Sequence, residues 1–122
     1  MQLNEPTLVE QLPALGVERL AGASIAERTS LGIGGTTDIL RVRQYQYLPD
    51  LIALLQDRGV PYRLLGGGTN LLVEDGELPW VFLTLDHGKQ GVRLEDRTAY
   101  VDAAADLGGM VTYCAKHDLG GM

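Results

Sequence analysis

The chain has 122 residues, enough for one ordinary domain, and its 45% hydrophobic and 21% charged residues are typical of a globular protein. Its net charge of −6 argues against general affinity for nucleic acid or for an anionic membrane surface. The sequence contains no apolar run long enough to span a membrane and no secretion signal at its start. Cys114 is the only cysteine and has no neighbours for a zinc site, so a cytoplasmic protein without a metal is expected.

Two short elements are predicted first along the chain. Residues 7–15 have the pattern of a short helix with Thr7 as its cap. Residues 38–43 have the composition of a strand. Arg41 and Arg43 share one face of that strand, and we expect it to lie at a sheet edge from which both side chains reach water.

The clearest predicted helix covers residues 48–58. Its apolar residues recur at the i, i+3, i+4, i+7 spacing of one helix face, at Leu48, Leu51, Ile52 and Leu55. Pro49 suits the first turn, and Gly59 is a natural stop. A short strand at 61–65 follows, and the order strand, helix, strand implies a right-handed crossover and a parallel pair of strands.

The rear of the chain predicts a buried strand, a hairpin and a helix. Residues 80–85 form an almost unbroken apolar run, as in a strand covered on both faces. Residues 92–103 alternate between apolar and polar, which indicates an antiparallel hairpin. Asp106 can cap a last helix at about 107–117. The composition changes near residue 88, so an α+β chain is expected, with an N-terminal extension (1–26), a first subdomain (27–88) and the start of a second, incomplete one (89–122).

The most informative stretch is Gly66-Gly67-Gly68-Thr69-Asn70-Leu71, which directly follows a predicted strand. Consecutive glycines let successive backbone N–H groups converge on one anion, and the Thr69 hydroxyl and Asn70 amide can add donors. The stretch is not a phosphate-binding Walker loop, because no Lys-Ser or Lys-Thr pair follows, and Leu71 breaks the dinucleotide pattern G-x-G-x-x-G. The alternative interpretation is a plain surface turn.

Two motifs together resemble the UDP-N-acetylenolpyruvoylglucosamine reductase family, bacterial flavoenzymes that make UDP-N-acetylmuramate for peptidoglycan. They are Thr29-Ser30-Leu31-Gly32-Ile33-Gly34-Gly35 and, about thirty residues later, Leu65-Gly66-Gly67-Gly68-Thr69-Asn70-Leu71-Leu72-Val73. Residues 101–107 and 115–121 are similar to the family's strand, helix and glycine turn, so the resemblance runs from about residue 27 to the end. One departure is Ala103-Ala104-Ala105, where the family has Gly-Ala-Gly.

The resemblance implies the vanillyl-alcohol-oxidase (PCMH-type) FAD-binding fold. It implies that Gly66 to Leu71 bind the diphosphate of FAD and that Ile33, Gly34 and Ala104 lie near the cofactor. For Ile33, Gly34 and Gly35 the alternative is a tight turn that leads into the strand at Asp38.

In the family, NADPH reduces FAD, and the reduced flavin passes hydride to the enolpyruvyl group of a nucleotide sugar. The serine, glutamate and arginine that assist this step lie beyond the last residue of this chain. No catalytic residue is therefore assigned, and the chain alone is expected to be inactive.

Two other functions stay open on the sequence. The first is another FAD-dependent oxidoreductase of the same fold, although the glycine loop has no nearby histidine or cysteine for covalent attachment of flavin. The second is a nucleotide-binding module without catalysis. The oligomeric state is left open.

Overall fold

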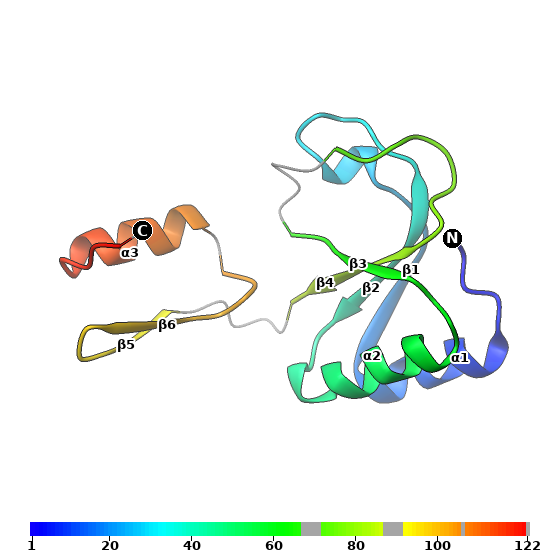
Figure 1. The fold of residues 1–122 in the computed structure, drawn as a ribbon, viewed down its shortest axis with the longest axis horizontal. Coiled ribbons are helices and arrows are strands. Elements are labelled where there is room, and N and C mark those ends of the chain that lie inside the picture. The colour runs from blue at the N-terminus through cyan, green and yellow to red at the C-terminus, as the bar shows by residue number, and fades with distance from the viewer. Residues whose placement is uncertain (67–71, 87–91, 106, 122) are drawn as a thin grey trace. The chain divides into compact units, whose positions relative to one another are not determined.

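The computed structural model describes residues 1–66, 72–86, 92–105 and 107–121 (Figure 1). These residues form two compact units, Met1–Leu85 and Asp86–Met122, and each unit is described by itself. The predicted mixture of helices and strands is confirmed. Within the described ranges, no helix is long and apolar enough to cross a membrane.

The first unit is built on a four-stranded sheet with the strand order β1-β2-β4-β3. Its strands are β1 (Val17–Ser24), β2 (Thr36–Val42), β3 (Tyr62–Leu64) and β4 (Val81–Leu85). β1 pairs antiparallel with β2, whereas β2 and β3 each pair in parallel with β4. The parallel direction predicted for β2 and β3 is confirmed, but these strands do not pair with each other. The buried strand β4 lies between them.

Strand β1 was not predicted. Its residues do not alternate between buried and exposed positions, and only Val17 and Ala23 are buried within it. A bulge between Leu20 and Ala23 also shifts its register. Because β1 covers one side of β2, the prediction that Arg41 lies on an edge strand is wrong: Arg41 lies on an interior strand.

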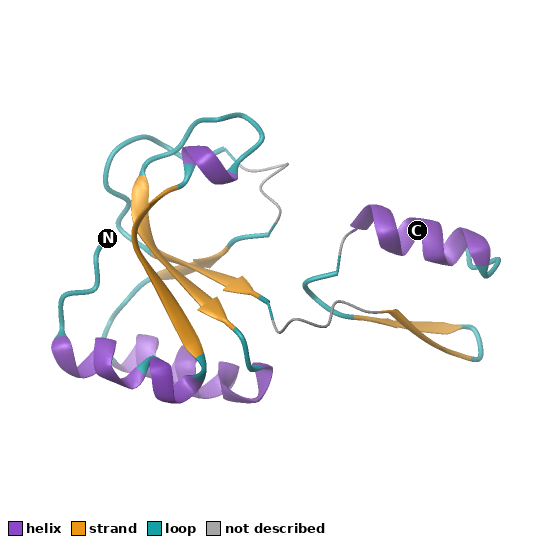
Figure 2. Cartoon of the chain, turned by 180° about the vertical axis from the view of Figure 1, so that it is seen from behind, coloured by secondary structure: helices purple, strands orange, loops and turns teal. Residues whose placement is uncertain are grey.

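Two helices cover one face of this sheet. α2 (Leu48–Asp57) and α1 (Pro6–Gln11) lie side by side beneath the strands in both views of the chain (Figures 1 and 2). α2 agrees with its prediction, and Gly59 follows it with a φ of 67°. α1 begins at Pro6, so Thr7 lies inside the helix and is not its cap, which corrects the prediction. Three short 3-10 helices complete the unit: η1 (Pro13–Leu15), η2 (Ala26–Arg28) and η3 (Tyr45–Tyr47).

The two faces of the sheet have separate apolar cores. The helix-side core joins the helices to Leu40 and Val42 of β2 and to Val81 and Leu83 of β4. The opposite core contains Ile39 and Phe82 from the sheet and is closed by residues of the irregular segments that follow β1 and β3: Ile25, Leu65, Val73 and Leu78. Loops rather than helices therefore cover this second face.

The second unit consists of a hairpin and a helix, as predicted. β5 (Val92–Glu95) and β6 (Thr98–Val101) pair antiparallel, and Asp96 in the turn has a φ of 54°. The helix is α3 (Leu107–Lys116). Its predicted cap, Asp106, lies outside the described residues.

Candidate functional site

Most of the predicted glycine loop, from Gly67 to Leu71, lies outside the described residues. Gly66 is described and exposed, and a Cβ atom added there would meet nothing within 4 Å. Packing within the described structure therefore does not require a glycine at this position. The open backbone leaves room for another molecule to approach.

The start of the loop is held firmly by the sheet. Leu65 is buried, its backbone N–H donates to the carbonyl of Leu83 at 2.9 Å, and its own carbonyl accepts from the Thr84 hydroxyl at 3.1 Å. These bonds place Gly66 at the carboxyl ends of the parallel strands β3 and β4. In sheets of this kind, ligands bind outside the carboxyl ends of the strands.

Neighbouring atoms lie close to Gly34 and Gly35. A Cβ atom on Gly35 would lie 1.7 Å from the carbonyl oxygen of Gly76, and one on Gly34 would lie 3.1 Å from the Cβ of Ile25. The backbone N–H of Gly35 also donates to the carbonyl of Glu74 at 2.9 Å. Ile33 is 46% exposed. Gly35 thus serves close backbone packing where the chain leads into β2, and Gly34 lies close to the Ile25 side chain. Cofactor contact at Ile33 and Gly34 stays a prediction.

Ala104 lies in the second unit, in a turn that Asp102 stabilises. The Asp102 carboxylate accepts from the backbone N–H of Ala104 at 2.8 Å, and the Asp102 carbonyl accepts from that of Ala105 at 3.0 Å. This turn leads toward α3. Its geometry neither needs nor excludes a cofactor at Ala104.

A cavity of about 240 Å³ opens beside Gly66 on the loop-covered face of the sheet. We call it the arginine pocket. Its polar lining is Arg28, Arg41, Thr84 and Gly66, and its apolar lining is Leu20, Ile39 and Leu65. Arg28 comes from η2 and Arg41 from β2, so two segments distant in sequence each contribute an arginine to the lining of one cavity.

The carboxylate of Glu18 forms ion pairs with two arginines, one of which, Arg41, lines this pocket. Glu18 Oε2 accepts from Arg43 Nη2 at 2.7 Å and from Arg41 Nη1 at 3.4 Å. The hydrogen bond from Arg43 and the positive charges of both arginines lower the pKa of the Glu18 carboxyl group. Arg28 Nη1 donates to a neutral partner, the carbonyl of Ser24, at 3.1 Å. Glu18 therefore compensates the charge of Arg41 only in part, and the pocket has positive character in an acidic chain.

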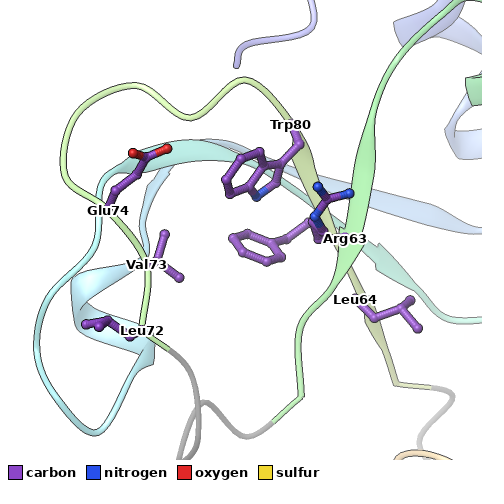
Figure 3. Close-up of a pocket in the computed structure, with 7 residues that line it drawn as sticks. Arg63, Leu64, Leu72, Val73, Glu74 and Trp80 are labelled. Atoms are coloured by element: carbon purple, nitrogen blue, oxygen red, sulfur yellow. The ribbon is translucent and has the colours of Figure 1, made fainter.

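A second cavity, of about 440 Å³, has a mainly apolar lining (Figure 3). Its residues are Arg63, Leu64, Leu72, Val73, Glu74, Trp80 and Phe82. The rings of Trp80 and Phe82 meet edge to face with centroids 6.4 Å apart, and the Arg63 guanidinium lies 5.1 Å from the centroid of Trp80. Leu64 and Leu72 are 65% and 71% exposed. The two cavities thus differ in the charged residues of their described lining: the first has two arginines and no carboxylate, whereas the second has one arginine and one glutamate among mainly apolar and aromatic side chains.

Arg28, Arg41 and Thr84 were missed as site residues. A signal for Arg41 existed, because the residues around it in the predicted strand, from Ile39 to Val42, are otherwise apolar. Arg28 and Thr84 gave no such signal, since only the folded chain brings them to one pocket. Among the described residues, no cluster of three or more His, Cys, Asp or Glu side chains is placed to hold a metal ion.

The chain resembles known proteins in sequence and in fold, although no protein-family model matches it. It is 31% identical over 113 residues to a UDP-N-acetylenolpyruvoylglucosamine reductase of Corynebacterium diphtheriae, which covers 92% of this chain and 30% of that protein. It is also 31% identical over 117 residues to the reductase of the same name from Halalkalibacterium halodurans, with 94% and 39% covered.

A solved structure gives the same result. The crystal structure of UDP-N-acetylenolpyruvylglucosamine reductase from Thermus caldophilus matches with a TM-score of 0.60 and 30% identity, over 86% of this chain and 35% of that one. The chain spans about a third of the length of the relatives that it matches. The chain is thus related in sequence and in fold to the UDP-N-acetylenolpyruvoylglucosamine reductases, as its two glycine motifs predicted.

Proposed function

We propose that this chain is the part of a UDP-N-acetylenolpyruvoylglucosamine reductase that binds the diphosphate of FAD through the backbone from Gly66 to Leu71. The observation that supports the proposal best is the position and surroundings of Gly66. It is exposed, has open space where a side chain would stand, and follows a residue bonded to β4 at the carboxyl ends of parallel strands. Ile33 and Gly34, and separately Ala104, are proposed as further cofactor contacts.

The proposed fold is the vanillyl-alcohol-oxidase (PCMH) type, in an enzyme of the cytoplasm that serves peptidoglycan synthesis. FAD, when bound, supplies hydride transfer from NADPH to the enolpyruvyl group of the nucleotide sugar. In this proposal the chain contributes binding and position: the backbone N–H groups from Gly66 to Leu71 hold the diphosphate. The hydrogen bonds of Leu65, which precedes them, fix where the loop starts. We assign no proton donor to this chain.

A pair of glycine variants in the complete parent protein tests the role of the loop. Gly66→Val places a side chain in open space, so the thermal midpoint of the FAD-free protein should not change, whereas FAD affinity should fall about tenfold or more. Gly35→Ala forces a Cβ against the backbone of Gly76, so the thermal midpoint itself should fall. Isothermal titration with FAD and thermal unfolding of the FAD-free protein measure the two effects.

Unchanged FAD affinity in Gly66→Val, with the fold intact, would contradict the proposed diphosphate site. The reductase assignment has its own test: the wild-type parent should oxidise NADPH only when UDP-N-acetylenolpyruvoylglucosamine is present. NADPH oxidation at the same rate with and without this substrate would favour another FAD-dependent oxidoreductase.

A further inference from the structure

Asp75 is the only aspartate in the sequence that a glycine follows directly. Asp75 and Gly76 lie in a bend of the segment that leads to β4. The main-chain nitrogen after an aspartate can attack the carboxyl carbon of that aspartate and close a five-membered ring. A glycine at the second position favours this attack, because it has no Cβ atom to crowd the attacking nitrogen.

The fold leaves both reacting groups of this pair unoccupied. Asp75 is exposed, and its carboxylate forms no hydrogen bond or ion pair with the described residues. The backbone N–H of Gly76 has no acceptor among those residues either. Gly76 has a φ of 93°, which glycine adopts without strain. Attack by the Gly76 nitrogen therefore breaks no hydrogen bond of the folded chain.

Asp57 shows how a different setting protects an exposed aspartate. Its side chain is 80% exposed, but its carboxylate lies 3.7 Å from Nε of Arg58. The residue that follows it is this arginine, whose backbone N–H donates to the carbonyl of Leu54 at 3.1 Å. At Asp57 the carboxylate is thus near a cation, and the nitrogen that would attack it is already hydrogen-bonded.

We propose that Asp75 is a site of spontaneous isomerisation to isoaspartate. The Gly76 nitrogen bonds to Cγ of Asp75, and its proton leaves with the carboxyl hydroxyl group as water, which gives a succinimide ring. Water then opens the ring at one of its two carbonyl carbons. Opening at Cγ restores aspartate, whereas opening at the main-chain carbon leaves Gly76 bonded to Cγ, which is isoaspartate. The reaction needs no oxidant, reductant or enzyme.

The modification would fall where the segment is tied to β2. The carbonyl of Glu74 accepts from the N–H of Gly35, and the carbonyl of Gly76 accepts from the N–H of Thr36, both at 2.9 Å. Isoaspartate adds one carbon to the main chain between these two carbonyls, a bond of about 1.5 Å. Hydrogen bonds tolerate only a narrow range of distances, so the two bonds keep their geometry only if the start of β2 moves. The close approach of Gly35 to the Gly76 carbonyl leaves little room for that movement.

Incubation of the complete protein in water enriched in oxygen-18, well below its thermal midpoint, tests the proposal. Each ring opening adds one heavy oxygen, so mass spectrometry of proteolytic fragments measures how often each aspartate reacts. We expect Asp75 to take up heavy oxygen at least about tenfold faster than Asp57, which corresponds to a barrier lower by about 1.4 kcal/mol. A protease that cleaves at aspartate but not at isoaspartate identifies the product.

Two variants of Asp75 change the reaction in opposite directions. Asp75→Glu keeps the charge, but its side chain would have to close a six-membered ring, so this variant should take up no heavy oxygen at position 75. Asp75→Asn forms the same succinimide with loss of ammonia, and should react faster because a neutral amide is attacked more readily than a carboxylate. Thermal unfolding before incubation checks that both variants fold.

Thermal unfolding after incubation tests the structural consequence. The wild-type midpoint should fall as isoaspartate accumulates, whereas that of Asp75→Glu should stay constant. Equal uptake of heavy oxygen at Asp75 and Asp57 would overturn the proposed site. A wild-type midpoint that stays constant while isoaspartate forms would overturn the predicted loosening of β2. FAD binding enters neither measurement, so these results are independent of the proposed function.

Discussion

The two faces of the four-stranded sheet differ in what covers them. On one face, α1 and α2 close a core whose central residues, such as Leu40 and Leu83, are fully buried. On the other face, irregular segments close a smaller core and leave the arginine pocket and the apolar cavity open beside it. A rigid, helix-covered face can hold strands in place while loops on the opposite face present binding groups. The helix side should therefore determine stability, and the loop side should determine binding.

The largest expected effect comes from the helix side. Leu83 is fully buried, and its partner in the register, Leu64, is 65% exposed. Leu83→Ala should lower the free energy of unfolding by about 2–5 kcal/mol, because it leaves a cavity in the helix-side core. Leu64→Ala, the matched control, should change it by less than about 0.5 kcal/mol. Urea unfolding measures both, and equal effects would contradict the division between core and surface at this register position.

A smaller effect is expected at Asp38, which is fully buried. Its carboxylate accepts hydrogen bonds at 2.8 Å from the Leu3 N–H and the Arg19 guanidinium, and at 2.9 Å from the Gly22 N–H. Asp38→Asn keeps the shape but loses the charge and part of this acceptor set. We expect it to lower the free energy of unfolding by about 1–3 kcal/mol.

Asp57 serves as the control for Asp38, because its side chain is 80% exposed. Asp57→Asn should leave the unfolding curve in urea nearly unchanged. If the two variants unfold at the same urea concentration, the buried carboxylate does not hold the N-terminal segment and β1 to β2.

The smallest expected effect is a change in how stability depends on pH, and it tests the charged side chains around Glu18. The hydrogen bond from Arg43 and the nearby positive charges hold the pKa of Glu18 below its ordinary value of 4.5. A carboxyl group with a lowered pKa in the folded state contributes stability above its unfolded pKa and loses it as the pH falls through the folded value. Stability should therefore decline on acidification below about pH 4.5 in part through Glu18.

Glu18→Gln should make this acid decline less steep, and Arg43→Gln, which removes the first cause of the shift, should do the same. Urea midpoints measured between neutral and acidic pH give the slope for each variant. An acid decline as steep as that of the wild type in Glu18→Gln would show that Glu18 does not contribute to it.

The sequence pattern predicted those helices and strands whose own residues have a clear apolar spacing. α2 has its apolar residues at helical spacing between Pro49 and Gly59, and β4 has a continuous apolar run. β1 has neither signal, because its buried residues do not alternate and a bulge interrupts it. The central place of β4 could not be predicted either, because the order of strands in a sheet does not follow from their order in the chain.

From the sequence, a candidate site could be proposed only where consecutive residues define the backbone chemistry. The glycine loop was proposed on that basis, and as a cofactor site it stays a prediction, with residues 67–71 outside the described residues. The reason for Gly35 was not found, since its close neighbour Gly76 lies far along the chain. Arg28 and Arg41 were not found for the same reason, because the pocket that joins them exists only in the folded sheet.

The contact between Gly35 and Gly76 has a consequence for how the glycine loop tolerates change. One end of the loop is tied to β4 through Leu65, and the segment after it is tied to the start of β2 through the bonds of Gly35 and Thr36 to Glu74 and Gly76. With both ends fixed, an inserted residue adds little closure entropy, since doubling a loop's length costs only about 0.6 kcal/mol. Under the proposed function, the same insertion would move the peptide N–H groups from Gly66 to Leu71 away from the diphosphate, so recognition rather than folding would set the length of this loop.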